Sequence, residues 1–200
     1  MHERLLGAYC EVRGHIPSYS PASEAISPIL KWPLGVLIAG LLAGCVTMGG
    51  GGPSATAELQ PTRGNSVAGK VMFTQKGDKV LVTANVSGLK PNQEHGFHVH
   101  EKGDCSSGDG MSAAGHFNPK GSPHGHHSTP ARHAGDMPNL KADAYGNASL
   151  RAELDIITVG EGPTSVVGRG LIVHANPDDY KSQPVGNAGA RMACAVIQKN

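Results

Sequence analysis

Short segments that fit β-strands recur along this chain, separated by residues that favour turns. Apolar and polar residues alternate, in places imperfectly, in 66–74, 79–86 and 148–154, and apolar segments cover 169–175 and 192–197. A period of two places alternate side chains on opposite faces of a strand. With 28 glycines, 14 prolines and only 4% aromatic residues, the composition favours turns over long helices. The sequence therefore predicts an all-β sandwich or barrel.

Turn signals and loops between these segments complete the expected outline. Lys76-Gly77-Asp78 closes one hairpin, and Tyr145-Gly146-Asn147 closes a second between 140–142 and 148–154. A loop of more than about 15 residues in a compact domain is usually functional. The two longest expected loops are 102–138 and 176–189. The remaining stretches are 55–65, expected to be loose, and 158–167, which could hold one helical turn.

The first part of the chain has the features of an export signal. Lys31 precedes a mostly apolar run from Leu34 to Ala43 that ends in small residues, as in secretory signal peptides. The run is too short to span a membrane, which needs about 20 residues. Leu42-Ala43-Gly44-Cys45 resembles a bacterial lipoprotein processing box, in which cleavage precedes the cysteine and the cysteine takes the lipid. The alternative is an ordinary signal peptide with a chance cysteine.

These features predict three parts. Residues 1–44 are the signal peptide, with a start that is too early, because 1–29 are polar and a start near Leu30 would leave a compact charged region. Residues 45–65 hold the lipidated Cys45 and a flexible glycine-rich tether. Residues 66–200 form one folded domain. The expected location is the periplasm, with a membrane contact only through the lipid anchor.

The segment His98-Val99-His100 places two histidines on one face of an expected strand, 94–101. Both rings point the same way, about 6.6 Å apart along the strand. Two imidazoles at that spacing can bind one metal ion, although the pattern also fits two half-exposed histidines at a sheet edge. Nine of the eleven histidines fall between His95 and His174. Since histidine is the commonest metal ligand, this content favours a metal site.

Three further groups supply the other ligands that such a site needs. They are Gly115-His116-Phe117, the stretch from His124 to Asp136, and Val173-His174. Zinc accepts a tetrahedral mixture of imidazole and carboxylate, whereas copper(II) favours imidazole nitrogens in a tetragonal arrangement. The zinc set comprises His116, His124, His133 and Asp136. Most of the ligands for a copper ion are supplied by His98, His100 and His174.

Longer motifs make the chain from about residue 66 to 198 resemble the copper/zinc superoxide dismutase family. They are Gly96-Phe97-His98-Val99-His100, Gly115-His116-Phe117-Asn118-Pro119, Arg132-His133-Ala134-Gly135-Asp136, Val173-His174 and Gly186-Asn187-Ala188-Gly189-Ala190-Arg191-Met192-Ala193-Cys194. The resemblance implies a Greek-key, eight-stranded β-sandwich or flattened barrel of immunoglobulin-like type, with two long functional loops. It also implies an enzyme that converts superoxide to dioxygen and hydrogen peroxide in antioxidant defence of the cell envelope.

The resemblance assigns the metal ligands, with one copper and one zinc per subunit. The implied copper ligands are His98, His100, His116 and His174. The implied zinc ligands are His116, His124, His133 and Asp136. His116 would therefore bridge the two ions.

The same resemblance assigns residues around the metals. Asp178 would hydrogen-bond one copper and one zinc histidine and fix their orientation, although it could instead be a solvated loop carboxylate. Arg191 would dock the anionic substrate beside copper, or could be an arginine at a sheet edge. Cys105 and Cys194 would form a disulfide, which an exported compartment permits.

The implied reaction has two halves. One superoxide reduces Cu(II) and leaves as dioxygen, and a second reoxidises Cu(I) and leaves as hydrogen peroxide with two protons. His116 would release copper on reduction, take up a proton and deliver it. Zinc has no redox chemistry and would keep the site's geometry. Lys102, Lys120 and Lys181 are candidates for steering the anion.

Three alternatives use a related fold: a metal carrier or copper chaperone, a copper-only relative, and a purely structural sandwich. Chaperone-like members lack some copper ligands or the arginine, and copper-only members lack the zinc ligands and the second loop, whereas this chain has them all. A structural sandwich has no reason to keep seven ligands. Superoxide is the expected partner, and a net charge of +1 argues against nucleic acid.

Two points stay open on the sequence alone. Envelope members of the family occur as monomers and as dimers, so the sequence leaves a homodimer undecided. His95 is expected to face away from His98, and His126 and His127 are expected to lie in solvent or to compete weakly for metal.

Overall fold

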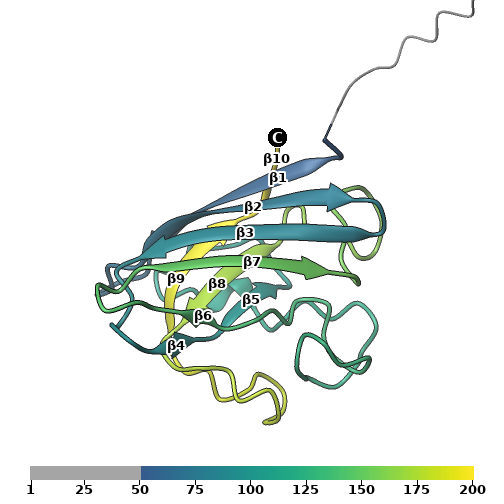
Figure 1. The fold of residues 1–200 in the computed structure, drawn as a ribbon. Coiled ribbons are helices and arrows are strands. Elements are labelled where there is room, and N and C mark those ends of the chain that lie inside the picture. Colours follow the sequence, from purple (N-terminus) through teal and green to yellow (C-terminus); the bar gives the residue numbers. More distant parts are fainter. Residues whose placement is uncertain (1–50) are drawn as a thin grey trace, which may run out of the picture. The chain divides into compact units, whose positions relative to one another are not determined.

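The computed structural model describes residues 51–200, which form strands, loops and one short 3-10 helix (Figure 1). The strands are β1 (Ser54–Pro61), β2 (Ala68–Lys76), β3 (Lys79–Ser87), β4 (Glu94–His95), β5 (Phe97–His100), β6 (Leu140–Lys141), β7 (Ala148–Leu154), β8 (Gly170–His174), β9 (Arg191–Val196) and β10 (Gln198–Lys199), and the 3-10 helix η1 is Met111–Ala113. None of the helical structure in this range is long and apolar enough to cross a membrane. The predicted signal peptide and Cys45 lie outside the described residues.

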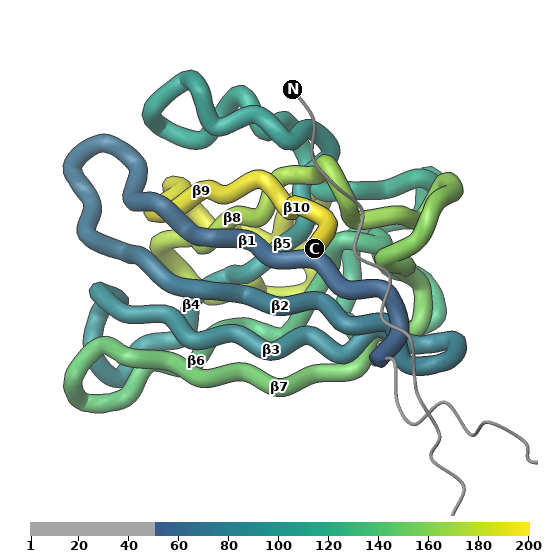
Figure 2. The backbone as a smooth tube through the Cα atoms, turned by 90° about the horizontal axis from the view of Figure 1, so that it is seen from above, coloured from purple at the N-terminus to yellow at the C-terminus, as the bar shows by residue number. Residues whose placement is uncertain are grey.

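The strands form two layers that share β1. The pairing order is β5-β8-β9-β1-β2-β3-β7, with β10 paired to β1 and a separate β4–β6 pair. β1 pairs with β2 from Ser54 to Leu59 and with β9 at Gln60 and Pro61, so it passes from one layer to the other. The layer of β2, β3 and β7 faces the layer of β5, β8 and β9 (Figure 2). After β3 the chain crosses to β5, returns to β7 and crosses again to β8, which confirms the predicted Greek-key all-β fold.

Strand β1 corrects the predicted flexible tether, 45–65, over residues 54–61. Ala55, Ala57 and Leu59 alternate with more exposed residues and are at most 1% exposed. Their period is two, but an alanine methyl contributes little to a hydrophobic pattern because it buries so little apolar area. The folded domain therefore begins by Ser54, and not at residue 66.

One core fills the space between the layers, and β5 and β8 are buried on both faces. Phe97 and Val99 join the core, whereas His98 and His100 point to the opposite face and are still fully buried. A strand that is buried on both faces needs a second cover. Here the long loops supply that cover, and the space beneath them holds the histidines.

Three local predictions differ from the structure. Gly96 interrupts the strand predicted at 94–101, and its N–H donates to the carbonyl of Asn176. The turn at 145–147 does not join two paired strands, because β6 pairs with β4 while β7 pairs with β3 in the other layer. Residues 158–167 form no helical turn, since Gly160, Gly162 and Pro163 oppose one.

Candidate metal centre

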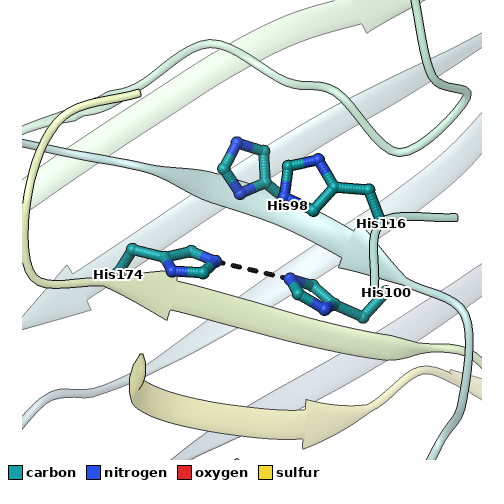
Figure 3. A group of neighbouring side chains, drawn as sticks. All are labelled: His98, His100, His116 and His174. Atoms are coloured by element: carbon teal, nitrogen blue, oxygen red, sulfur yellow. Dashed lines mark hydrogen bonds between the residues drawn. The ribbon is translucent and has the colours of Figure 1, made fainter. Parts of the chain in front are cut away.

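Four histidines meet where β5 and β8 face the long loops. His98 and His100 lie on β5, His174 ends β8, and His116 lies beside His100 in the loop after β5. One ligand atom from each lies within 4.8 Å of the others. The rings of His98 and His100 are 6.3 Å apart between centroids, close to the spacing that a period of two predicts. Figure 3 shows His100 and His174 facing each other, with His98 and His116 side by side.

Hydrogen bonds at the outer nitrogens fix where the lone pairs of His100 and His174 point. A carbonyl oxygen can only accept, so His100 Nδ1 donates to Ala114 O at 2.9 Å and His174 Nδ1 donates to Gly189 O at 3.1 Å. Each Nε2 therefore carries a lone pair, and these two atoms are 3.4 Å apart. Two acceptors at that distance repel unless a cation lies between them.

His98 and His116 direct two more nitrogens toward the same space. His98 Nε2 donates to the Asp178 carboxylate at 2.8 Å, which leaves Nδ1 as the acceptor nitrogen. His98 Nδ1 and His116 Nε2 are buried without a hydrogen-bond partner. Burial lowers the pKa of His98, and lowers that of His100 and His174 further below the usual value. Four neutral imidazole nitrogens that converge in this way fit copper(II).

A second group surrounds one carboxylate oxygen of Asp136. Its Oδ1 lies 2.9 Å from His116 Nδ1, 3.0 Å from His124 Nδ1 and 3.5 Å from His133 Nδ1. Ligands about 2.0–2.1 Å from zinc in a tetrahedron are about 3.3 Å from one another. His133 Nδ1 is buried and has no hydrogen-bond partner. Three imidazole nitrogens and one carboxylate oxygen at these distances fit a zinc ion.

The protonation of this second group also favours a cation. Burial would raise the pKa of Asp136, but hydrogen bonds from His116 and His124, with His133 also close by, hold it well below its usual range. Burial, together with the neighbouring His98, lowers the pKa of His116 to about 4. Burial also opposes the charge on His124, yet hydrogen bonds to Asp136 and Asp178 raise its pKa to about 9. Metal-free His124 therefore holds a proton at neutral pH, and zinc would replace that proton.

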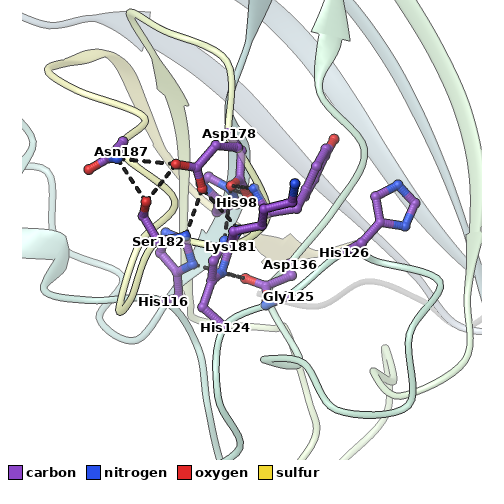
Figure 4. Close-up of polar contacts among 12 residues, drawn as sticks. His98, His116, His124, Gly125, His126, Asp136, Asp178, Lys181, Ser182 and Asn187 are labelled. Carbon is purple, nitrogen blue, oxygen red and sulfur yellow. Dashed lines mark hydrogen bonds and ion pairs between the residues drawn. The ribbon is translucent and has the colours of Figure 1, made fainter.

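Asp178 joins the two groups through their outer nitrogens. Its Oδ2 accepts from His98 Nε2 at 2.8 Å and its Oδ1 from His124 Nε2 at 2.9 Å, as Figure 4 shows. Asp178 is 3% exposed, and these hydrogen bonds hold its pKa well below the usual range although burial opposes the shift. One carboxylate thus orients one ring of each group.

Asn139 and Tyr180 hold Asp178, and no sequence pattern indicated either residue. The Asn139 amide accepts from Asp178 N–H at 3.0 Å and donates to Asp178 O at 3.1 Å. Tyr180 N–H donates to Asp178 Oδ1 at 2.7 Å, and the Tyr180 hydroxyl accepts from Asn139 N–H at 2.8 Å. Asp178 is therefore fixed at its main chain as well as at its carboxylate.

Main-chain bonds bring the metal-binding segments onto β5. Val99 N–H donates to Gly135 O at 3.0 Å, Phe117 N–H donates to Val99 O at 2.8 Å, and Gly135 N–H donates to Phe117 O at 2.9 Å. A Cβ atom at position 135 would overlap the Val99 carbonyl, so this approach requires glycine. These main-chain hydrogen bonds place the loop residues His116 and Asp136 beside the histidines of the strand.

Arg191 lies next to the first group of histidines and is held by a loop. It is the cross-strand neighbour of His174. Its guanidinium donates to Gly110 O at 2.6 Å and to Ala114 O at 2.5 Å. Ala114 O also accepts from His100, so one carbonyl positions both a ligand candidate and the arginine.

The predicted disulfide is present and ties this loop to β9. Cys105 and Cys194 are bonded, with their Cα atoms 5.8 Å apart. Cys194 lies on β9, three residues after Arg191, and Cys105 begins the segment that carries Gly110 and Ala114.

The other histidines and the steering lysines lie outside both groups. His95 is fully buried, and its Nδ1 donates to the carbonyl of His174 at 2.9 Å. The rings of the half-buried His126 and His127 lie 4.0 Å apart between centroids and are tilted by 41°, and His126 points away from the metal groups in Figure 4. The three candidate steering lysines are all exposed: Lys102, Lys120 and Lys181.

The chain is similar to one protein family and to several known proteins. A family model described as "Copper/zinc superoxide dismutase (SODC)" matches residues 67–197. The chain is 43% identical over 148 residues to "Superoxide dismutase [Cu-Zn] 2" of Aquifex aeolicus (strain VF5), which covers 72% of this chain and 86% of that protein. It is 43% identical over 137 residues to "Superoxide dismutase [Cu-Zn]" of Paramecium bursaria Chlorella virus 1, covering 66% and 72%. A crystal structure described as that of the clock protein EA4 matches with a TM-score of 0.67 and 40% identity, over 75% of this chain and 97% of the other.

Proposed function

Because the chain belongs to the copper/zinc superoxide dismutase family, we propose that its two ligand groups, joined at His116, are the copper and zinc sites of that enzyme. The chain dismutates superoxide to dioxygen and hydrogen peroxide, with copper and zinc as cofactors. Copper would be held by His98, His100, His116 and His174, and zinc by His116, His124, His133 and Asp136. Bound copper supplies the one-electron couple for both half-reactions, and bound zinc supplies charge without redox chemistry.

The chain's own residues bind the anion and supply a proton. The Arg191 guanidinium is always charged and lies beside His174, so it attracts superoxide to the first group and orients it there. His116 Nε2, which has no hydrogen-bond partner, can take up a proton and give it to the reduced oxygen species.

One observation carries the proposal: His116 presents one nitrogen to each group. Its Nδ1 faces Asp136 Oδ1 at 2.9 Å, its Nε2 has no hydrogen-bond partner, and one of its ring nitrogens lies within 4.8 Å of the ligand atoms of His98, His100 and His174. No simpler role explains a buried ring shared between two sets of convergent ligand atoms.

Metal analysis combined with a superoxide assay tests the proposal. We expect one copper and one zinc per chain, with turnover that chelation abolishes and metal return restores. His116→Ala should lose turnover and disturb both metals, whereas His126→Ala, outside both groups, should keep both. Full metal content without turnover, or unchanged metal content in His116→Ala, would refute the assignment.

We further propose that the enzyme is exported and held at the membrane by a lipid on Cys45. Lys31, the apolar run that follows it and Leu42-Ala43-Gly44-Cys45 support this proposal. The Cys105–Cys194 disulfide fits an oxidising compartment. In this location the enzyme would remove superoxide within the cell envelope.

Expression of the full chain in a bacterial host tests this location. The mature protein should begin at Cys45, carry acyl chains by mass spectrometry and partition into detergent. Cys45→Ser should be found in the aqueous phase with unchanged specific activity. A mature protein without acyl chains would exclude the anchor.

A further inference from the structure

The loop at 176–189 contacts His124 at two separate places. At the ring, Asp178 accepts from His124 Nε2 at 2.9 Å. At the main chain, Gln183 accepts from His124 N–H through Oε1 at 2.8 Å and donates to His124 O through Nε2, also at 2.8 Å. The exposed Gln183 therefore pairs with both backbone groups of a residue that is only 4% exposed.

Further bonds within the loop hold Gln183 in place for this contact. The Asp179 carboxylate accepts from the N–H groups of Lys181 and Ser182 at 2.9 and 2.8 Å, and from Asn187 Nδ2 at 3.1 Å. Hydrogen bonds from Ser182 and Lys181 lower the pKa of Asp179 to about 2. The carboxylate therefore stays ionised and keeps accepting these hydrogen bonds near neutral pH.

A glycine lets the loop lie directly over the Asp178–His124 bond. A Cβ atom at Gly186 would overlap the Asp178 carboxylate and come within 2.8 Å of His124 Nε2. The backbone at Gly186 has a φ of +66°, which glycine adopts without strain. The loop thus packs against His124 closely enough for Gln183 to reach its main chain.

We propose that Gln183 is a positioning residue for zinc. It fixes the main chain of His124 and so keeps His124 Nδ1 aimed at Asp136 Oδ1, 3.0 Å away. Gln183 touches neither the metal nor a ligand atom and acts through the backbone of His124. The inference rests on the zinc site proposed above and goes beyond it by assigning the residue that holds one ligand in place.

The contacts predict that loss of Gln183 weakens the binding of zinc and leaves the binding of copper unchanged. Gln183 makes no hydrogen bond to His98, His100 or His174 among the described residues. Loss of a partner that orients a metal ligand typically weakens metal binding by about 10–100-fold. Since Gln183 is exposed and acts through the main chain, we expect the lower end of that range.

Zinc titration of the metal-free full chain tests this assignment, with a competing chelator to report the dissociation constant. Gln183→Ala should raise the zinc dissociation constant about tenfold and leave that of copper within about twofold. Gln183→Glu, which keeps the acceptor for His124 N–H but loses the donor, should give an intermediate zinc constant. Ser182→Ala, which keeps the Ser182 N–H that donates to Asp179 and does not touch His124, should bind zinc as the wild type does.

Cobalt(II) in the zinc site separates a positioning role from a merely structural one. In Gln183→Ala the visible absorption of bound cobalt should change in position or intensity, while the unfolding of the metal-free protein stays close to that of the wild type. A wild-type protein that binds no zinc would overturn the proposed site itself. Wild-type zinc binding together with an unchanged zinc constant and cobalt spectrum in Gln183→Ala would overturn only the role of Gln183.

Discussion

At the scale of single residues, the second nitrogen of each histidine decides what the first can bind. His100 and His174 use Nδ1 to donate to carbonyls and present Nε2 inward, whereas His98 donates from Nε2 to Asp178 and presents Nδ1. Strand alternation predicts which way each ring points. It does not predict which nitrogen faces the metal, because the outer acceptor comes from a distant part of the chain.

The raised pKa of His124 predicts that zinc binding depends on pH. Below its pKa of about 9, metal-free His124 holds a proton that zinc must displace, so zinc affinity should rise about tenfold per pH unit and level off above that value. His116, with a pKa of about 4, stays neutral over this range. Competition titrations across the range, with calorimetry in buffers of different ionisation enthalpy, measure the slope and the proton released. A zinc affinity that is flat from about pH 6 to pH 8 would contradict this view of the site.

Arg191 should affect catalysis without affecting metal content. Arg191→Ala removes the charge that attracts superoxide, so kcat/KM should fall by about tenfold or more and inhibition by small anions should weaken. Arg191→Lys keeps the charge but not the two-pronged geometry, and should recover part of the rate. Rapid-mixing or pulse-radiolysis kinetics with metal analysis provide the measurement. Unchanged kinetics in the alanine variant would remove Arg191 from the mechanism.

At the scale of elements, the segment after η1 carries backbone strain at the site. Ala114 has φ of +62° and ψ of −148°, a region that is almost restricted to glycine. The strain is found where the Ala114 carbonyl accepts from both His100 and Arg191. The conformation therefore turns one carbonyl toward two functional side chains.

Relief of this strain should stabilise the fold. Ala114→Gly should raise the free energy of unfolding by about 1 kcal/mol, because the relief of about 1–3 kcal/mol exceeds the added flexibility of the unfolded chain. Activity should be retained, since the carbonyl stays in place. Ala113→Gly, at a fully buried neighbour, should instead destabilise the protein. Denaturant unfolding of both variants gives the comparison, and a less stable Ala114→Gly would contradict the strain argument.

Strand predictions succeeded where bulky apolar residues alternate and failed where they do not. β3 carries Val80, Val82 and Val86 on its buried face and is recognisable from its sequence. β1 buries mainly alanines on its inward face and was not predicted as a strand, whereas β6 lies within the predicted segment 140–142 but pairs with β4 and not with β7. The β2–β3 hairpin was predicted correctly, but the partners of the other strands could not be predicted, because their pairing depends on the whole chain.

At the scale of the whole molecule, the disulfide links the metal loop to the last layer of the sandwich. Cys105 and Cys194 are 89 residues apart, and closing a loop of that length should stabilise the fold by about 4–5 kcal/mol. Cys105→Ser should therefore lower the free energy of unfolding by about that amount, and should slow turnover because Gly110 and Ala114 hold Arg191. Denaturant unfolding under oxidising conditions measures the loss. A loss below about 1 kcal/mol would show that the link is not what stabilises the loop.

The ligand groups could be predicted from the sequence, whereas their supports could not. Each ligand candidate lies in a short local motif, and the metal requires those residue types. Asn139, Tyr180 and Gln183 act through ordinary amide, hydroxyl and backbone groups that many other residues also offer. Only the folded chain brings Gln183 to His124, 59 residues away.

The hydrogen bonds between Val99, Phe117 and Gly135 also bear on self-association of the protein. β8 covers one side of β5, and these bonds occupy the N–H and C=O of Val99 on the other. A free strand edge is a template on which another chain can add a strand. The loop that carries the ligands therefore also closes that edge of β5 against the addition of a strand from another copy.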